Sequence, residues 1–269
     1  MQGKDTLWNS YNDHIATDFL GLRNYRSILD VGCGSGMWTW TLRRLTKSKS
    51  VRLIGIDFDR ESLKRASKIL GARTTFIAAD ASFLPLKDNC IDYVTCRRLL
   101  INLGRRKRRD SLREMIRVAR VGGVVSPVEP SLQTNKANRF STVRGGQQFS
   151  RRLEKAVSGT DFTLGPRIAH ILVQEGLARV KVWAYLLVDS ILPPKYHSMF
   201  LNPVVHGGGF AHALTTVHPP FRGNMASNLA HEAEKLDREV KKQMRRKAFV
   251  SVSATPVFIA RGTKPSLET

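Results

Sequence analysis

Short apolar runs and segments with helical spacing alternate along this chain. The runs are rich in Val, Ile and Leu, which predicts buried strands, and the segments between them place apolar residues three and four positions apart, which predicts amphipathic helices. We expect strands at residues 28–31, 51–57, 74–78, 124–128, 180–187 and 249–260, with one more ending at Cys96. We expect helices at residues 7–20, 38–45, 59–70, 112–118, 168–177 and 225–246. This alternation predicts an α/β fold.

Glycines at alternate positions separate the first strand from the helix that follows it. They lie in the stretch Ser27-Ile-Leu-Asp-Val-Gly-Cys-Gly-Ser-Gly-Met-Trp-Thr39. Glycine accepts positive φ and close backbone approach, so a tight turn with free amides is expected before the helix, where a small ligand can bind. A dinucleotide-binding fingerprint would require glycine in place of Met37, which argues against NAD.

Acidic residues follow the next two predicted strands. Asp57 ends the strand at 51–57, and Asp80-Ala81 follows the strand at 74–78. Ligands of doubly wound sheets bind at the carboxyl ends of the strands, so these residues should meet the glycines at one edge. From that edge, Asp57 could accept hydrogen bonds from both hydroxyls of a ribose.

At this point the motifs resemble those of class I S-adenosylmethionine (SAM) dependent methyltransferases. The resemblance rests on Asp30-Val-Gly-Cys-Gly-Ser-Gly36, on the "LP-x-x-D-x-x-x-D" passage that begins at Leu84, and on "E-x-x-R-V-x-x-x-G-G" from Glu114, with Val121 where proline is usual. It covers residues 25 to 130 firmly and 165 to 262 loosely. It implies a doubly wound, mostly parallel seven-stranded sheet, an antiparallel last strand, and SAM as the cofactor.

The resemblance and the chemistry together give the expected site residues. The candidates for contact with the cofactor are Asp30, Gly32, Gly34, Ser35, Gly36, Asp57, Phe58, Asp80, Ala81, Cys96 and Tyr11. The candidates for a general base near the acceptor are Glu129, His206 and His212, of which Glu129 is the best placed because it ends the fifth strand. The histidine spacing does not dictate a metal site, and none is expected.

Two features bear on the methyl acceptor, and they point in different directions. Residues 97–109 and 130–153 contain twelve Lys or Arg and no acid, a basic rim that would attract an RNA backbone. Residues 196–221 contain no Lys, Arg, Asp or Glu and would suit a lid over an apolar acceptor, or a homodimer interface. The motifs of amine-directed base methylation and of pyrimidine-ring attack are missing.

These features lead to a first hypothesis and two alternatives. The motif set most resembles quinone-type and other small-molecule methyltransferases, so a small or amphiphilic acceptor is the leading hypothesis. An RNA methyltransferase is the second, and a SAM-binding regulator without activity is the third.

Composition and length complete the expectations. The chain of 269 residues carries 44 Lys and Arg against 22 Asp and Glu, a net charge of +22 that indicates an anionic partner or surface. Three cysteines, no secretory signal and no long apolar run predict a cytoplasmic protein without a transmembrane segment. One domain is expected over residues 1–269, with cap segments at 1–20, 131–165 and 195–222.

Overall fold

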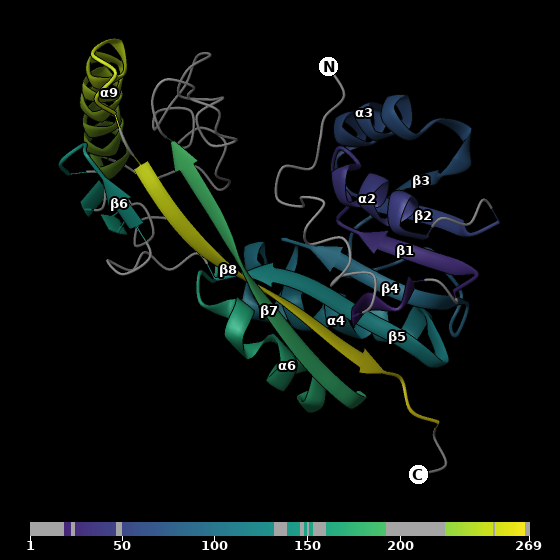
Figure 1. Ribbon diagram of the computed structural model, residues 1–269. Helices are drawn as coiled ribbons and strands as arrows, with labels where there is room; N and C mark the ends of the chain where they lie inside the picture. Colours follow the sequence, from purple (N-terminus) through teal and green to yellow (C-terminus); the bar gives the residue numbers. More distant parts are fainter. Residues whose placement is uncertain are drawn as a thin grey trace. The chain divides into compact units, whose positions relative to one another are not determined.

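The computed structural model describes residues 19–22, 25–46, 50–131, 139–145, 148–149, 151–152, 160–191, 224–249 and 251–266. The chain divides into two compact units (Figure 1). The first consists of Met1–Ser131, Thr163–Tyr185 and Val257–Thr269, and the second of Leu132–Phe162 and Leu186–Pro256. The prediction of one domain with three cap segments stays a prediction, since residues 192–223 and most of 1–20 lie outside the described part.

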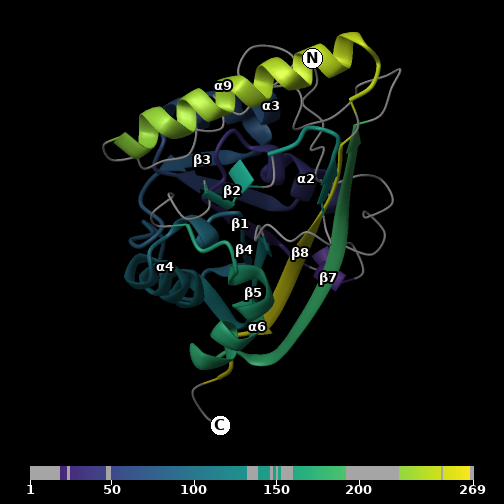
Figure 2. The ribbon, with the colours of Figure 1, turned by 90° about the vertical axis from the view of Figure 1, so that its left-hand side faces the viewer.

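The sheet has the doubly wound topology that the sequence predicts. Its strands are β1 (Ser27–Val31), β2 (Arg52–Asp57), β3 (Thr75–Ala78), β4 (Ile91–Arg97), β5 (Ala119–Pro130), β6 (Arg139–Ser141), β7 (Ala178–Ile191) and β8 (Ser251–Thr263). The order is β3-β2-β1-β4-β5-β8-β6, and β7 also pairs with β8 (Figure 2). The strands from β1 to β5 pair in parallel, and β8 is antiparallel to β5, as expected. The three-residue β6 is the one strand of this sheet that the sequence did not predict.

Helices cover both faces of the sheet in the first unit. They are α2 (Met37–Thr46), α3 (Arg60–Leu70), α4 (Arg105–Val118) and α6 (Leu164–Gln174), with the short 3-10 helices η2 (Gly71–Arg73) and η3 (Leu100–Asn102). Figure 1 shows α2 and α3 on one face and α4 and α6 on the other. The central strands between them are mostly apolar, because both faces of a sheet covered in this way are buried. All residues of β1 are buried accordingly.

Local signals set several of these boundaries. Asp59 caps α3, as its position predicts, and its carboxylate accepts a hydrogen bond from the Glu61 amide at 3.0 Å. β5 begins at Ala119 rather than at 124, because a bulge lies inside the strand. At this bulge Gly122 has a φ of +72°, and its amide and the carbonyl of Gly123 bond to the backbone of Lys264.

The second unit contains the longest helix, α9 (Asn224–Arg245), close to the predicted 225–246. Leu229, Ala233, Leu236 and Val240 form its buried side. The residues between 141 and 152 that the structure describes pack beside this helix, where the Thr142 hydroxyl donates to Gln243 at 2.6 Å. Among the described residues, no helix combines the length and apolar character needed to cross a bilayer.

Candidate active site

The glycine stretch forms a tight turn between β1 and α2. The amides of Gly32 and Cys33 both donate to the carbonyl of Ile56, at 2.7 and 3.0 Å, which fixes the turn beside β2. All three glycines have positive φ, as predicted. Apart from its two chain neighbours, no atom of the described residues lies within 4 Å of the position that a Cβ at residue 34 would take, so these residues leave this side of the turn open to a ligand.

The other two glycines are required by close neighbours. A Cβ on Gly32 would lie 2.8 Å from Leu99 Cδ1, and one on Gly36 would lie 2.9 Å from the Cβ of Ala66. The turn is therefore held between α3 on one side and the segment after β4 on the other. Leu99 carries no sequence signal for this role, because only the fold brings it to the glycine turn.

Asp57 joins the end of β2 to the glycine turn. Its Oδ2 accepts a hydrogen bond from the Gly34 amide at 2.7 Å, and its Oδ1 accepts one from the Asp59 amide at 2.9 Å. Phe58, the next residue, is 82% exposed. A carboxylate and an exposed apolar ring thus lie next to each other at the open edge of the sheet, together with the glycine turn.

Asp80 lies after β3 and is held by an ion pair that the sequence did not predict. Lys107 Nζ on α4 lies 2.7 Å from its Oδ2, and the amide and hydroxyl of Ser82 donate to its Oδ1. Lys107, followed by the Ser82 bonds, lowers the pKa of Asp80 to about 2, so the carboxylate stays charged. Ala81 is half-buried, and Phe83 beside it is 79% exposed, which adds a second exposed ring that the sequence reasoning missed.

Glu129, at the end of β5, is fully buried and capped by backbone amides. Its Oε1 accepts hydrogen bonds from Leu99 and Leu100 at 3.1 and 2.8 Å, and its Oε2 accepts one from Ile101 at 3.3 Å. Burial raises its pKa to about 7 even though these amides favour the charged form. The carboxylate therefore holds the turn that begins η3, the same turn from which Leu99 contacts Gly32.

Two further predicted cofactor residues have buried side chains. Asp30 is fully buried, and its Oδ2 accepts a hydrogen bond from the Thr39 hydroxyl at 2.6 Å, which ties β1 to α2. Cys96 is also fully buried, with its Sγ 3.9 Å from Glu129 Oε1. Burial raises the pKa of this thiol well above its usual value, so it stays protonated. Ser35 is half-buried within the glycine turn.

Tyr11, His206 and His212 lie outside the described residues, so their predicted roles stay predictions.

Part of the basic rim is occupied by contacts within the protein. Arg108 is buried and donates to the carbonyls of Leu100 and Leu103, both at 2.9 Å. Arg109 pairs with Glu175 at 2.9 Å, and Lys107 pairs with Asp80 as described. The run at 105–109 therefore presents fewer unoccupied cations than its sequence indicates, because three of its five side chains bind groups of the protein.

The motif that begins at Glu114 also has a structural explanation. Glu114 accepts a hydrogen bond from the Leu84 amide at 2.7 Å, and Arg117 donates to the carbonyls of Leu84 and Leu86 at 3.0 and 2.9 Å. The pair thus holds residues 84–86 of the loop between β3 and β4, directly after Phe83. These motif residues therefore have a structural role in fixing this loop.

Comparison with known proteins agrees with this geometry. A family described as "Methyltransferase domain" matches residues 28–123. The demethylmenaquinone methyltransferase of Staphylococcus aureus strain MRSA252 is 35% identical over 120 residues, which are 43% of this chain and 47% of that protein. The same enzyme of strain JH9 is 34% identical over the same shares. The chain thus spans about half the length of the curated relatives it matches.

Solved structures share the fold at low identity. The YcgJ protein of Bacillus subtilis has a TM-score of 0.59 and 14% identity, covering 96% of this chain and 100% of that one. The [4+2]-cyclase SpnF has a TM-score of 0.56 and 17% identity, covering 96% and 84%. A phosphoethanolamine N-methyltransferase of Haemonchus contortus, crystallised with S-adenosylhomocysteine, has a TM-score of 0.53 and 16% identity, covering 96% and 53%. Residues 28–123 of the chain are thus similar to a methyltransferase domain, and the chain shares its fold with these solved structures.

Proposed function

We propose that this protein transfers a methyl group from SAM to a small or amphiphilic acceptor. The observation that carries the proposal is the glycine turn held by Asp57, with its outer side open at the carboxyl edge of the sheet. A sulfonium methyl needs little chemical activation, so the protein mainly has to hold donor and acceptor in line. The acceptor class follows from the family likeness and from the printed name of the Staphylococcus aureus relatives.

The residues at this edge fit the parts of SAM. Asp57 offers a carboxylate to the ribose hydroxyls, and the exposed rings of Phe58 and Phe83 offer apolar surface to the adenine. Asp80 can accept a hydrogen bond from the adenine amine on Oδ2, where Lys107 is the one partner identified among the described residues. The backbone at Gly34 and Ser35 leaves room for the methionine part. When bound, SAM supplies the methyl group, and S-adenosylhomocysteine is the group that leaves.

We assign Glu129 a positioning role in this reaction. Its two oxygens already accept three amide hydrogen bonds and its side chain has no exposed surface, so it is poorly placed to take a proton from an acceptor. Through the turn at 99–101 it instead sets the place of Leu99 against Gly32. This proposal replaces the expectation that Glu129 acts as a base.

Calorimetry with SAM tests the cofactor site. Asp57→Ala should weaken SAM binding at least tenfold, because the ribose would lose a charged acceptor. Asp59→Ala is the matched control, since it removes a nearby carboxylate that caps α3 and should leave SAM affinity within twofold. Equal affinities for Asp57→Ala and the wild type would contradict the proposed site.

Incubation with methyl-labelled SAM tests the acceptor. We expect the label in the lipid or small-molecule extract of cell material. Label confined to RNA would favour the second candidate, an RNA methyltransferase. The exposed cations of the basic rim support this candidate. SAM binding without label in any extract would identify a SAM-binding regulator. Turnover must be measured because the same fold occurs in proteins with other activities, such as the [4+2]-cyclase SpnF.

A further inference from the structure

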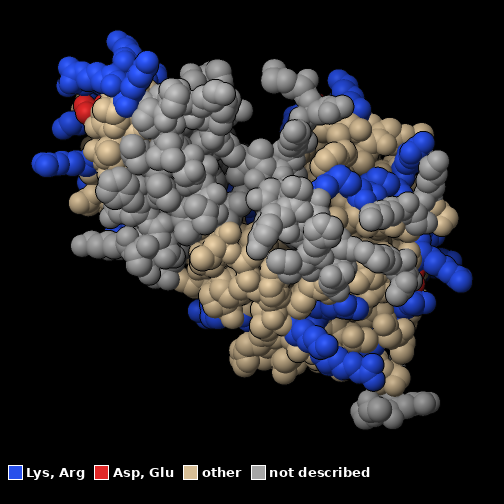
Figure 3. Space-filling model, viewed as in Figure 1, with Lys and Arg blue, Asp and Glu red and all other residues tan. Residues whose placement is uncertain are grey.

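Lys and Arg side chains gather along α9 in the second unit (Figure 3). Residues 235–247 include seven Lys or Arg but only two acids, Asp237 and Glu239. All seven cations are exposed, whereas Leu236 and Val240 on the same helix are buried. The helix therefore uses its apolar side for packing within the protein and presents its cations to solvent.

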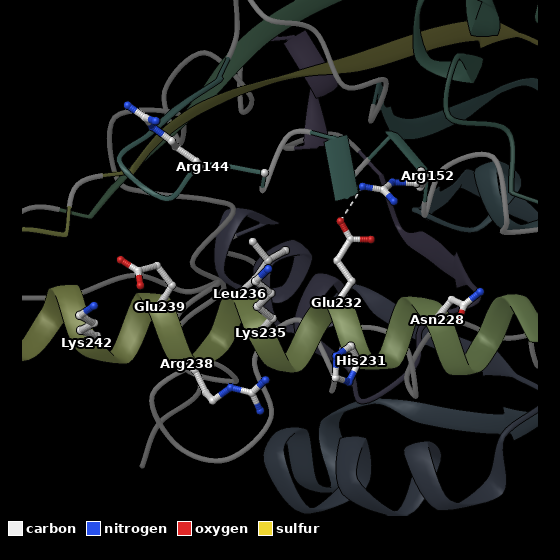
Figure 4. A pocket seen from close by; sticks show the side chains of 11 residues that line it. Arg144, Arg152, Asn228, His231, Glu232, Lys235, Leu236, Arg238, Glu239 and Lys242 are labelled. Carbon is white, nitrogen blue, oxygen red and sulfur yellow. Dashed lines mark hydrogen bonds and ion pairs between the residues drawn. The ribbon is translucent and has the colours of Figure 1, made fainter.

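A groove of about 720 Å³ lies along this helix (Figure 4). Its charged lining comes from two segments that are far apart in the sequence. Five cations line it: Arg144 and Arg152 from the segment facing α9, and Lys235, Arg238 and Lys242 from α9 itself. An anion in the groove would thus meet positive charge from both walls.

The described lining of the groove also contains two carboxylates, fewer than its five cations. Glu232 pairs with Arg152 at 2.7 Å, and Glu239 accepts a hydrogen bond from Gln243 Nε2 at 2.9 Å. The first contact, together with the bond between Thr142 and Gln243, also joins the two walls. The walls are therefore connected by specific side-chain bonds, and the described lining keeps more cations than anions.

The lining favours a polymeric anion over a small molecule or a bilayer. Pockets for small molecules are mostly apolar, but Leu236 is the one large apolar side chain among the described residues of this lining. A flat bilayer would reach the outermost charges, whereas a strand can enter between two walls. Lys235 and Lys242 are separated by about 10 Å along the helix axis, which matches about three phosphates of a nucleic-acid strand.

We propose that this groove binds the phosphate backbone of a nucleic-acid strand. Because its described lining has no Phe, Tyr or Trp on which a base could stack, binding should depend little on base sequence. The proposal concerns a surface of the second unit and does not rest on methyl transfer. Failure of the methyl-transfer proposal would leave nucleic-acid binding testable, and failure of nucleic-acid binding would leave methyl transfer testable.

Fluorescence anisotropy with a labelled 20-nucleotide RNA tests the groove in the full chain without SAM. About five phosphate contacts predict a roughly hundredfold loss of affinity between 50 and 200 mM salt. The triple variant Lys235→Gln/Arg238→Gln/Lys242→Gln should bind at least tenfold more weakly at 100 mM salt. The slope of log affinity against log salt should fall by about two.

The matched control removes three exposed cations from α3 of the first unit: Arg60→Gln/Lys64→Gln/Lys68→Gln. It lowers the net charge equally, so an affinity within threefold of wild type is expected. A second groove variant, Arg144→Gln/Arg152→Gln, tests the opposite wall and should weaken binding at least fivefold. SAM affinity by calorimetry should be unchanged in both groove variants.

Three outcomes would overturn the proposal. One is equal loss of RNA affinity in the α9 and α3 variants, which would mean that net charge alone attracts RNA. Another is no RNA binding by the wild type. The third is binding to vesicles of phosphatidylglycerol and phosphatidylcholine that needs the α9 cations while RNA binding does not, which would assign the surface to a membrane. A DNA strand of the same sequence shows whether the sugar contributes.

Discussion

Two buried carboxylates hold backbone turns at opposite ends of the central strands. Asp92, at the start of β4, accepts hydrogen bonds from the amides of Arg26 and Ser27 at 2.7 and 2.9 Å and pairs with Arg120 at 2.9 Å. Glu129, at the end of β5, accepts three amide hydrogen bonds, and none of the described residues forms an ion pair with it within 4.0 Å. Both carboxylates thus bind backbone amides, and Asp92 also forms an ion pair, with Arg120.

The difference shows where the fold accepts an energetic cost. Burying a carboxylate costs free energy, and at Glu129 this cost outweighs the amide hydrogen bonds and the charge of Arg98, so burial raises its pKa. Its turn also includes Arg98, whose φ of +56° is uncommon for a residue with a side chain. Both features occur where the glycine turn lies, and such features tend to cluster at functional sites.

Replacing each carboxylate by its amide gives the largest expected effect. Glu129→Gln and Asp92→Asn should each lower the free energy of unfolding by about 2 kcal/mol. Glu129→Gln leaves one of its two groups of buried amides without an acceptor, and Asp92→Asn replaces the ion pair with Arg120 by an NH2 group that cannot accept. Only Glu129→Gln should also weaken SAM binding, at least tenfold by calorimetry. If Asp92→Asn weakened SAM binding equally, general loss of stability would explain both results.

The contact between Leu99 and the glycine turn gives the next effect. Gly32→Ala should lower SAM affinity about tenfold and stability by about 2 kcal/mol, from the clash and from the positive φ. Gly71→Ala, at a φ of +61° with open space around it, should show only the conformational part of the stability loss. Combining Gly32→Ala with Leu99→Ala should recover part of the SAM affinity, because the clash is removed. No recovery would show that the contact between Leu99 and Gly32 does not affect SAM binding.

The pH dependence of stability tests the charge state of Glu129. Because its pKa is higher in the folded protein than in the unfolded chain, the native state binds the extra proton and stability falls as pH rises. The free energy of unfolding should lose up to about 1.4 kcal/mol per pH unit between about pH 5 and 7 from this group. Urea denaturation of wild type and Glu129→Gln should show that the variant lacks this part of the slope, while an identical slope would refute the assignment.

The ion pair at Asp80 gives the smallest effect, because both side chains are about half exposed. Lys107→Gln should raise the pKa of Asp80 from about 2 toward its usual range, as measured by NMR titration of the carboxyl carbon. SAM affinity should change less than threefold, because Asp80 would keep its bonds from Ser82. Arg106→Gln, an exposed neighbour in the same run, serves as the control and should leave this pKa unchanged.

Sequence patterns predicted most of the fold because each signal is local. The spacing of apolar residues located the strands and helices, and Asp59 marked the start of α3. The glycines at 32, 34 and 36 predicted the turn, since positive φ is a property of single residues. The bulge in β5 could not be predicted from the sequence, because it depends on hydrogen bonds that Gly122 and Gly123 form with the distant Lys264.

The sequence by itself determined the fold class, the likeness of residues 28–123 to a methyltransferase domain and the place of Asp57 beside the glycine turn, because these follow from short-range patterns and from the parallel arrangement of strands. Only the tertiary structure decided what Glu129, Leu99 and Lys107 contact. Their partners lie 27 to 67 residues away along the chain. No periodicity or motif specifies such distant pairs, since they form only when the strands and helices pack.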